Sequence, residues 1–366
     1  MTLEVGRPLQ GAPLGHERAS LLDVKDLSVE FRLRKKVVHA VNGFSCSVSP
    51  GETLAILGES GSGKSVTAHA IMGTLNTTTA KVTGGEVWFE GRDLLRLPDR
   101  ERRRVRGRKI AIIFQDSLSA LNPLFTVANQ IGEMFRFHDG MNKRAAERAA
   151  VDLMGRVGIP DARRRAGAYP HEFSGGMRQR IMIAMALALD PALLIADEPT
   201  TALDVTVQAQ IMELLKDLQR EMGMGLVLIT HDLGVVADMA DRIVVMYAGK
   251  AVEVSPVHDL YSSPGHPYTA GLLQSIPRLD SAEDELRPIG GAPPDMTRLA
   301  TGCSFQPRCR WAQNICKGEP PPLRTVADGR RSACHFAEAV LHGDEAVLHG
   351  DQAVLVGDEA SGDEHA

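Results

Sequence analysis

The sequence predicts an α/β fold, in which a parallel sheet is combined with an antiparallel β subdomain and an inserted helical subdomain. The runs KIAIIFQ, LLIADEP and LVLITHD are apolar at nearly every position and alternate with helical stretches. Such runs are typical of parallel strands that helices cover on both faces. The run TLAIL meets a glycine-rich turn and then a helical pattern, and this strand–loop–helix order belongs to the same fold class.

The remaining segments differ in composition. The alternating runs LLDVKDLSVEF and EVWFE predict antiparallel strands near the start of a domain that spans residues 20–255. Within it, residues 121–189 are helical in pattern and rich in Ala, Met and Arg, which predicts the inserted helical subdomain. The charged run RERRRVRGRK, at 100–109, predicts a solvated face rather than a binding patch.

Both ends of the chain differ from this domain. Residues 1–19 contain several Gly and Pro residues and are predicted to be disordered. From residue 256 to 338 the composition turns to Pro, Gly and Cys, which predicts a small C-terminal extension. Residues 339–366 contain the acidic repeats AVLHGDE, AVLHGDQ and AVLVGDE, which are too short to bury much surface and predict a disordered tail.

Size and charge exclude several classes of protein. A chain of 366 residues with 43% hydrophobic and 24% charged residues predicts two or three units with real cores. The net charge of −5 gives no basic footprint for nucleic acid. Five cysteines do not suggest a secreted disulfide scaffold. Without a signal peptide or a long apolar run, we expect a cytoplasmic protein that reaches a membrane only through a partner.

The segment GESGSGKS fits the phosphate-loop pattern G-x-x-x-x-G-K-[ST] between a strand and a helix. Its glycines let the backbone turn tightly, so that N–H groups point at phosphate oxygens. Lys64 adds a cation for the β and γ phosphates, and Ser65 offers a hydroxyl to Mg²⁺. The predicted phosphate-binding residues are Gly58, Ser60, Gly61, Gly63, Lys64 and Ser65.

Four further polar side chains follow predicted strands. Asp197 ends the run LLIAD and can hold Mg²⁺, and Glu198 beside it can polarise an attacking water. Gln115 ends KIAIIFQ and is a candidate ligand of Mg²⁺ or of the water, while His231 ends LVLITH and could contact the γ-phosphate. Because ligands of such sheets bind at the carboxyl ends of the strands, we expect these groups to share one site with the phosphate loop.

The order GESGSGKS, FQD, FSGGMRQR, LLIADEPTTALD and ITHD closely resembles the ATP-binding subunits of ABC transporters over about residues 20–255. The resemblance implies a P-loop NTPase (RecA-like) core that hydrolyses ATP with Mg²⁺. It makes Glu198 the general base, Gln115 the Q-loop residue and His231 the switch histidine, with Lys64 in the catalytic set. No element of the ATPase machinery is missing.

The resemblance also explains the Ser-Gly-Gly that opens a helix in FSGGMRQR, since this signature motif closes on the ATP of a partner domain in a head-to-tail dimer. Ser174, Gly175 and Gly176 would meet the partner's nucleotide, and Asp204 would be the D-loop residue at the interface. The motif differs from the commoner LSGGQ at its first and last positions, but its phosphate-contacting residues are intact. Phe31 is the candidate for stacking on adenine.

Four cysteines lie in the predicted extension. Cys303, Cys309, Cys316 and Cys334 are separated by five, six and seventeen residues, and chemistry alone leaves an iron–sulfur cluster, zinc or free thiols open. The stretches SSPGHPYTAGLLQSIP and GCSFQPRCRWAQNIC resemble the C-terminal extension of the oligopeptide/dipeptide permease branch. That resemblance implies that these four cysteines hold a 4Fe–4S cluster, whereas Cys46 is expected in the core.

The resemblance therefore implies the ATP-hydrolysing subunit of an importer of di- and oligopeptides. Its implied partners are a second ATP-binding chain, two transmembrane permease subunits and an extracytoplasmic peptide-binding protein. The second ATP-binding chain is expected to be a different chain, with a copy of this chain as the alternative. The chain would be peripheral on the cytoplasmic face of the membrane. Two alternatives are an importer of nickel, glutathione or another small solute, and a soluble ABC ATPase of DNA repair or of ribosomes, which usually has a long insertion or two ATPase units.

Overall fold

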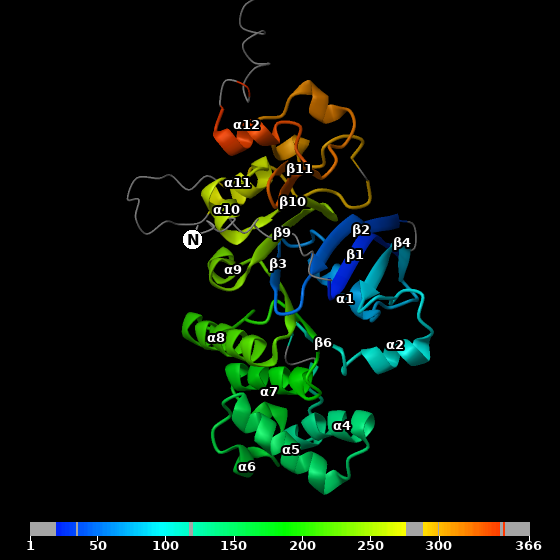
Figure 1. The fold of residues 1–366 in the computed structure, drawn as a ribbon, viewed down its shortest axis with the longest axis vertical. Coiled ribbons are helices and arrows are strands. Elements are labelled where there is room, and N and C mark those ends of the chain that lie inside the picture. The colour runs from blue at the N-terminus through cyan, green and yellow to red at the C-terminus, as the bar shows by residue number, and fades with distance from the viewer. Residues whose placement is uncertain are drawn as a thin grey trace, which may run out of the picture.

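A computed structural model describes most of the chain (Figure 1). The described residues are 20–33, 36–116, 120–275, 288–298, 300–344 and 347. The predicted disordered segment 1–19 and residues 345–346 and 348–366 of the acidic repeat tail therefore lie outside the described residues. The first residues of that tail instead belong to a helix, α12, which spans Ala337–His342. Among the described residues, no helix has both the length and the apolar character that crossing a bilayer requires.

The core is an eight-stranded sheet with the order β11-β12-β10-β9-β3-β8-β7-β6. The five strands from β9 to β6 run parallel, and the three at the other edge are antiparallel. Every residue of β3, β7 and β8 is buried, as the continuous apolar runs predict. The strand bounds are β3 Thr53–Leu57, β6 Ile110–Ile113, β7 Leu193–Asp197, β8 Gly225–Thr230, β9 Arg242–Tyr247, β10 Lys250–Pro256, β11 Arg324–Ala327 and β12 Arg330–Ser332.

A second, antiparallel sheet has the order β2-β1-β4-β5 and forms the predicted β subdomain beside the core (Figure 1). Its buried residues, including Leu22, Phe44 and Val87, pack with the inner face of the main sheet in one apolar cluster. This shared cluster fixes the subdomain against the phosphate-loop side of the core. The bounds are β1 Leu22–Leu33, β2 Lys36–Val48, β4 Ala80–Phe89 and β5 Arg92–Asp93.

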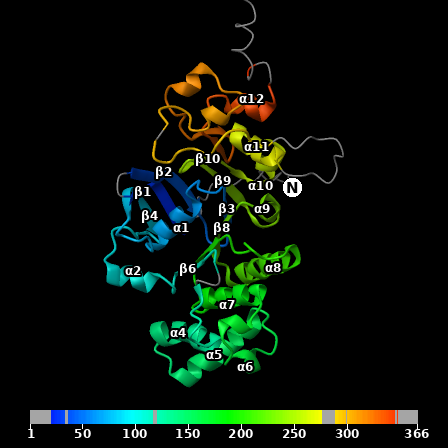
Figure 2. The ribbon, with the colours of Figure 1, turned by 180° about the vertical axis from the view of Figure 1, so that it is seen from behind.

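Helices cover both faces of the main sheet and form the inserted subdomain at one end of the molecule (Figures 1 and 2). The amphipathic helix α4 turns Val127 and Ile131 into a core that α7 shares with α8, so the subdomain is packed directly on the sheet. The helices before the C-terminal segment are α1 Lys64–Met72, α2 Asp99–Val105, α4 Val127–Asp139, α5 Lys143–Arg156, α6 Ala162–Arg165, η1 Pro170–Glu172, α7 Gly175–Leu187, α8 Val205–Met222 and α9 Leu233–Met239.

The C-terminal segment lies at the opposite end of the molecule from the inserted helices (Figure 2). Its strand β12 pairs with β10, with Ser332 opposite Glu253, so the main sheet continues across the expected boundary at residue 256. Tyr268 and Phe305 join Tyr247 of β9 in a third apolar cluster. The remaining elements are α10 Val257–Ser262, α11 Pro267–Gln274, η2 Gln306–Arg308, η3 Asn314–Lys317 and α12 Ala337–His342.

Candidate nucleotide site

The loop between β3 and α1 is shaped by glycines that cannot be replaced without strain. Gly63 has φ 108°, and a β-carbon there would lie 2.4 Å from the carbonyl oxygen of Ala40. A β-carbon at Gly58 would lie 2.3 Å from the carbonyl oxygen of Met246. Ser60 and Gly61 are exposed at the tip of the loop. The backbone is thus held in a turn whose N–H groups can reach an anion.

Lys64 begins α1 directly after this turn and is only 5% exposed. Its Nζ donates to the carbonyl oxygens of Gly58 and Glu59, at 2.8 and 3.0 Å. Burial lowers the pKa of the ammonium, and the carboxylates of Glu198, Asp197 and Glu59 oppose that shift. A cation thus sits inside the loop, with its hydrogen bonds directed at the loop backbone.

Ser65 and Asp197 meet beside the loop. Ser65 Oγ donates to Asp197 Oδ1 at 3.0 Å, and Asp197 is 3% exposed at the end of β7. Burial raises the pKa of this carboxyl, while the hydrogen bond from Ser65 lowers it. A hydroxyl and a carboxylate are the oxygen donors that Mg²⁺ prefers, so this pair fits the metal that an ATPase requires.

Three polar side chains converge on Glu198, the residue after β7. Gln115 Nε2 donates to Glu198 Oε2 at 2.8 Å, and Thr201 Oγ donates to the same oxygen at 2.9 Å. His231 Nδ1 lies 3.5 Å from Glu198 Oε1. Glu198 has φ 46°, a left-handed conformation that few side chains adopt. The surrounding contacts hold Glu198 in this strained backbone conformation. In that conformation its carboxylate lies close to all three partners.

The signature residues lie at the start of α7. Ser174 is its N-cap, where Oγ accepts the N–H of Met177 at 3.4 Å. Ser174 and Gly175 are exposed, whereas a β-carbon at Gly176 would lie 2.5 Å from Val207 Cγ1 of α8. Two glycines therefore bring the positive end of a helix to the surface, where an anion could approach it.

The two other predicted residues have simple local surroundings. Asp204 is exposed and caps α8, with its Oδ1 accepting the N–H of Val207 at 3.0 Å. Phe31, in β1, is half-buried against the core of the antiparallel subdomain and pairs in register with Val38 and Ala80.

Comparisons with known proteins match two regions of the chain. Residues 41–201 match the model of the family "ABC transporter", and residues 252–316 match "Oligopeptide/dipeptide transporter, C-terminal region". A putative peptide import ATP-binding protein of Brucella melitensis is 50% identical over 87% of this chain and 97% of its own length. The chain belongs to the ATP-binding proteins of ABC transporters.

Two other relatives are equally similar to this ABC protein. The oligopeptide transport ATP-binding protein OppD of Salmonella typhimurium and the dipeptide transport ATP-binding protein DppD of Bacillus subtilis are each 51% identical over 86% of this chain, and cover 93% and 94% of their own lengths. A dimeric ATP-binding cassette solved with ADP and Pi is 29% identical with a TM-score of 0.58, over 64% of this chain and 98% of its own.

These findings confirm the predicted family, the α/β fold with its antiparallel β subdomain and helices, and ATP hydrolysis as the activity. The family also gives ATP and Mg²⁺ as what the site binds. Cassettes of this family form dimers and work with membrane-spanning permeases. The roles of individual residues within that activity stay predictions.

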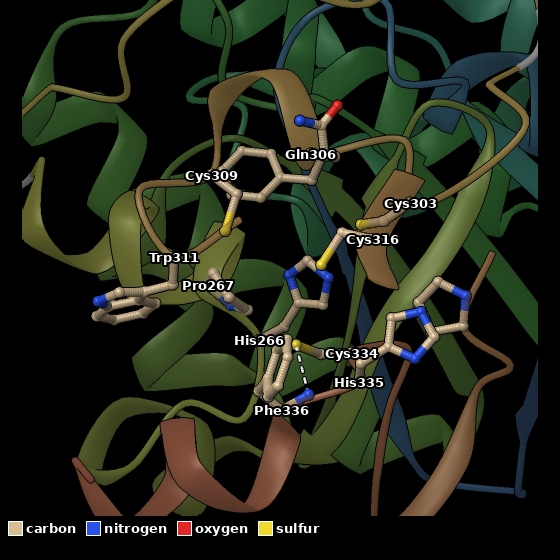
Figure 3. A pocket seen from close by; sticks show the side chains of 12 residues that line it. His266, Pro267, Cys303, Gln306, Cys309, Trp311, Cys316, Cys334, His335 and Phe336 are labelled. Carbon is tan, nitrogen blue, oxygen red and sulfur yellow. Dashed lines mark hydrogen bonds between the residues drawn. The ribbon is translucent and has the colours of Figure 1, made fainter. Parts of the chain in front are cut away.

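The iron–sulfur prediction for this ABC protein is wrong. Cys303, Cys309, Cys316 and Cys334 all line one small cavity in the C-terminal segment (Figure 3). However, within the part of the chain that the structure describes, no three His, Cys, Asp or Glu side chains are grouped so that they could hold a metal ion. The cavity is also lined by the aromatic rings of His266, Phe305, Trp311 and Phe336.

The chemistry of the thiols explains the correction. Burial raises the pKa of Cys309 to about 11 and that of Cys334 to about 12, and it raises the pKa of Cys303 as well. A metal ligand must be a thiolate, and an apolar cavity favours the neutral thiol instead. All five cysteines are free. The four cysteines of the predicted cluster do line one cavity, but the side chains around them form a packed apolar core.

Sequence reasoning missed two groups of residues at the nucleotide site. Thr201, which donates to Glu198, stands in the segment EPTTALD, where its hydroxyl carried no signal of its own. Arg308 and Tyr268 contact the phosphate-loop residue Glu59 from the C-terminal segment. No local pattern joins residues more than 200 positions apart, so only the fold could reveal this contact.

Proposed function

We propose that this protein is the ATP-hydrolysing subunit of an ABC importer that takes up di- and oligopeptides. Its fold and family make it an ABC ATPase. Peptide as the cargo is supported by the names of the relatives OppD and DppD, which it matches over nearly their whole length, and by the match of residues 252–316 to the oligopeptide/dipeptide transporter region.

The observation that carries the mechanism is the convergence of Gln115 and His231 on Glu198 next to the Ser65–Asp197 pair. Glu198 accepts a proton from the attacking water as general base, while Gln115 and His231 orient its carboxylate. Both side chains are largely exposed, so they can also contact a γ-phosphate.

The phosphate loop binds and orients the nucleotide in this proposal. The backbone N–H groups of the loop, which contains Gly58, Ser60, Gly61 and Gly63, cradle the phosphates. Lys64 neutralises negative charge on the β and γ phosphates. Ser65, Asp197 and the amide oxygen of Gln115 would hold the metal. Bound Mg²⁺ would supply positive charge that stabilises the phosphoryl group during transfer. Phe31 is the proposed adenine-stacking residue.

The signature serves a second cassette. Ser174, Gly175 and Gly176 present a capped, exposed helix start, which suits the γ-phosphate of a nucleotide in a partner's phosphate loop. Asp204, exposed at the start of the neighbouring helix α8, contacts that partner. The preferred partner is a different ATP-binding chain, with a copy of this chain as the alternative, and each closure of the pair encloses two nucleotides.

The assembled importer also contains two transmembrane permease subunits and receives its cargo from an extracytoplasmic peptide-binding protein. The chain is peripheral on the cytoplasmic face of the membrane, where it transmits closure to the permeases. Within it, residues 20–255 form the ATPase domain, residues 121–189 the helical subdomain, and residues 256–338 the extension.

An uptake assay tests this function. Cells lacking the chain receive the wild-type protein, Glu198→Gln, or the control Glu213→Gln, which changes an exposed carboxylate on α8. We expect labelled di- and oligopeptide uptake with the wild type and the control, and none with Glu198→Gln. Peptide uptake that persists without the chain, with loss of nickel or glutathione uptake, would contradict peptide as the cargo.

A further inference from the structure

The phosphate loop contains one carboxylate, and the C-terminal segment neutralises it. Arg308, at the end of η2, donates from its two terminal nitrogens to the two oxygens of Glu59, at 2.7 and 3.0 Å. The Arg308 side chain is only 6% exposed and that of Glu59 is 27% exposed. A bidentate pair of this kind fixes geometry as well as charge, and its partial burial limits screening by solvent.

A second contact from the same segment holds the backbone of Glu59. The N–H of Glu59 donates to Tyr268 Oη at 2.9 Å, and Tyr268 is fully buried in α11. The rings of Tyr247 and Tyr268 are 4.6 Å apart, and Arg308 Cζ lies 5.9 Å from the Tyr247 ring. Arg308 Nε donates to the carbonyl oxygen of Gly290 at 3.0 Å. Both contacts with Glu59 therefore come from a rigid, packed part of the extension.

The charge of Glu59 matters because its loop binds a polyanion. The carboxylate already acts on Lys64, whose pKa it raises against the effect of burial. An unpaired carboxylate beside the loop would repel nucleotide phosphates. In turn, the hydrogen bonds that Arg308 donates to Glu59 raise the pKa of Arg308 above its usual range, so the guanidinium stays charged.

We propose that Arg308 and Tyr268 are positioning residues for ATP binding: the C-terminal extension keeps Glu59 in a neutral ion pair and fixes the loop backbone at that residue. The inference rests on the proposed function only in that this loop binds ATP. It gives the extension a direct role at the nucleotide site, which neither its sequence nor the family match assigns.

The test measures nucleotide affinity of the full-length chain by titration calorimetry in the Glu198→Gln background, where hydrolysis does not interfere. We expect Arg308→Gln to weaken MgATP binding on the order of tenfold, as Coulomb repulsion at an effective protein dielectric predicts. The loss should be smaller for ADP, which carries less charge, and should shrink as salt rises. The matched control is Arg310→Gln, since Arg310 is exposed and stacks on Trp311 instead.

A second substitution separates charge neutralisation from simple structural support. In the double variant with Glu59→Gln and Arg308→Gln, no carboxylate remains to repel phosphate, so we expect affinity within about threefold of the control. If Arg308→Gln does not fold, Arg308→Lys replaces it. Because Lys keeps the positive charge beside Glu59, we expect its MgATP affinity to lie within about threefold of the control, and a loss of about tenfold would contradict the inference.

Two results would overturn the inference: Arg308→Gln binding MgATP as tightly as the control, or the double variant staying as weak as Arg308→Gln. Equal losses for ATP and ADP at every salt concentration would also overturn it, because charge would then not be the cause. If the control itself binds no MgATP, the proposed function fails as well, so the two failures are distinguishable.

Discussion

The buried side chain of His266 leads us to predict that the free energy of unfolding decreases measurably in acid. It is 1% exposed in the C-terminal segment, where its Nδ1 accepts the N–H of Tyr268 at 3.0 Å and caps α11. Burial lowers its pKa from the ordinary 6.5 to about 3. The imidazole of His266 therefore binds a proton near pH 6.5 in the unfolded chain but stays neutral in the folded chain. The free energy of unfolding falls as the pH falls below that value.

The size of the effect follows from linkage. At pH 5 the unfolded histidine is protonated, and one and a half pH units at about 1.4 kcal/mol per unit give about 2 kcal/mol of lost unfolding free energy relative to pH 7.5. His266→Asn keeps a side-chain oxygen that can cap the helix but does not titrate. Comparing the two proteins cancels the other titrating groups, which both contain.

The assay is urea unfolding of both proteins at pH 7.5 and pH 5. Between the two pH values, we expect the wild type to lose about 2 kcal/mol more unfolding free energy than His266→Asn. The ring contacts that the variant lacks lower its stability equally at both pH values and therefore do not change this difference. An identical pH dependence for both proteins would refute the inference that a neutral, buried imidazole holds α11.

The remaining predictions concern the nucleotide site. Glu198→Gln should lower ATP turnover by about 10²–10⁴-fold and still bind ATP, since only the proposed base is lost. Lys64→Ala should lose ATP binding as well as turnover. Turnover near the wild-type rate in either variant would contradict the assignment. Gly176→Ala should destabilise the protein by about 1–3 kcal/mol in urea unfolding, because its β-carbon would overlap Val207. Adding Val207→Ala should recover most of that loss, and a double variant no more stable than Gly176→Ala would show that the clash is not the cause.

Much of the nucleotide site could be predicted from sequence because its residues are fixed by local structure. Lys64 and Asp197 each stand at the junction of a buried strand with a turn or helix, and parallel strands bring such junctions to one edge of a sheet. Gln115 and His231 could be placed there for the same reason. Their common contact with Glu198, however, depends on side-chain directions that no spacing specifies.

The C-terminal segment was harder to predict because its contacts are made across long stretches of chain. The pairing of Ser332 with Glu253 adds strands to the core sheet, although the composition suggested a separate unit. The four cysteines meet as predicted in one region, but whether they bind metal depends on the burial of Cys309 and Cys334, which is a property of the packed cavity. The ion pair of Arg308 with Glu59 has no sequence signature at all.

The central claim is that each nucleotide is enclosed between the phosphate loop of one cassette and the signature of another. The most direct measurement is ATP turnover per molecule of the purified cassette pair over a wide range of dilution. We predict a constant rate while the pair is associated and a steep fall once it dissociates, as sedimentation of the same samples would show. Full turnover by dissociated cassettes would contradict the account.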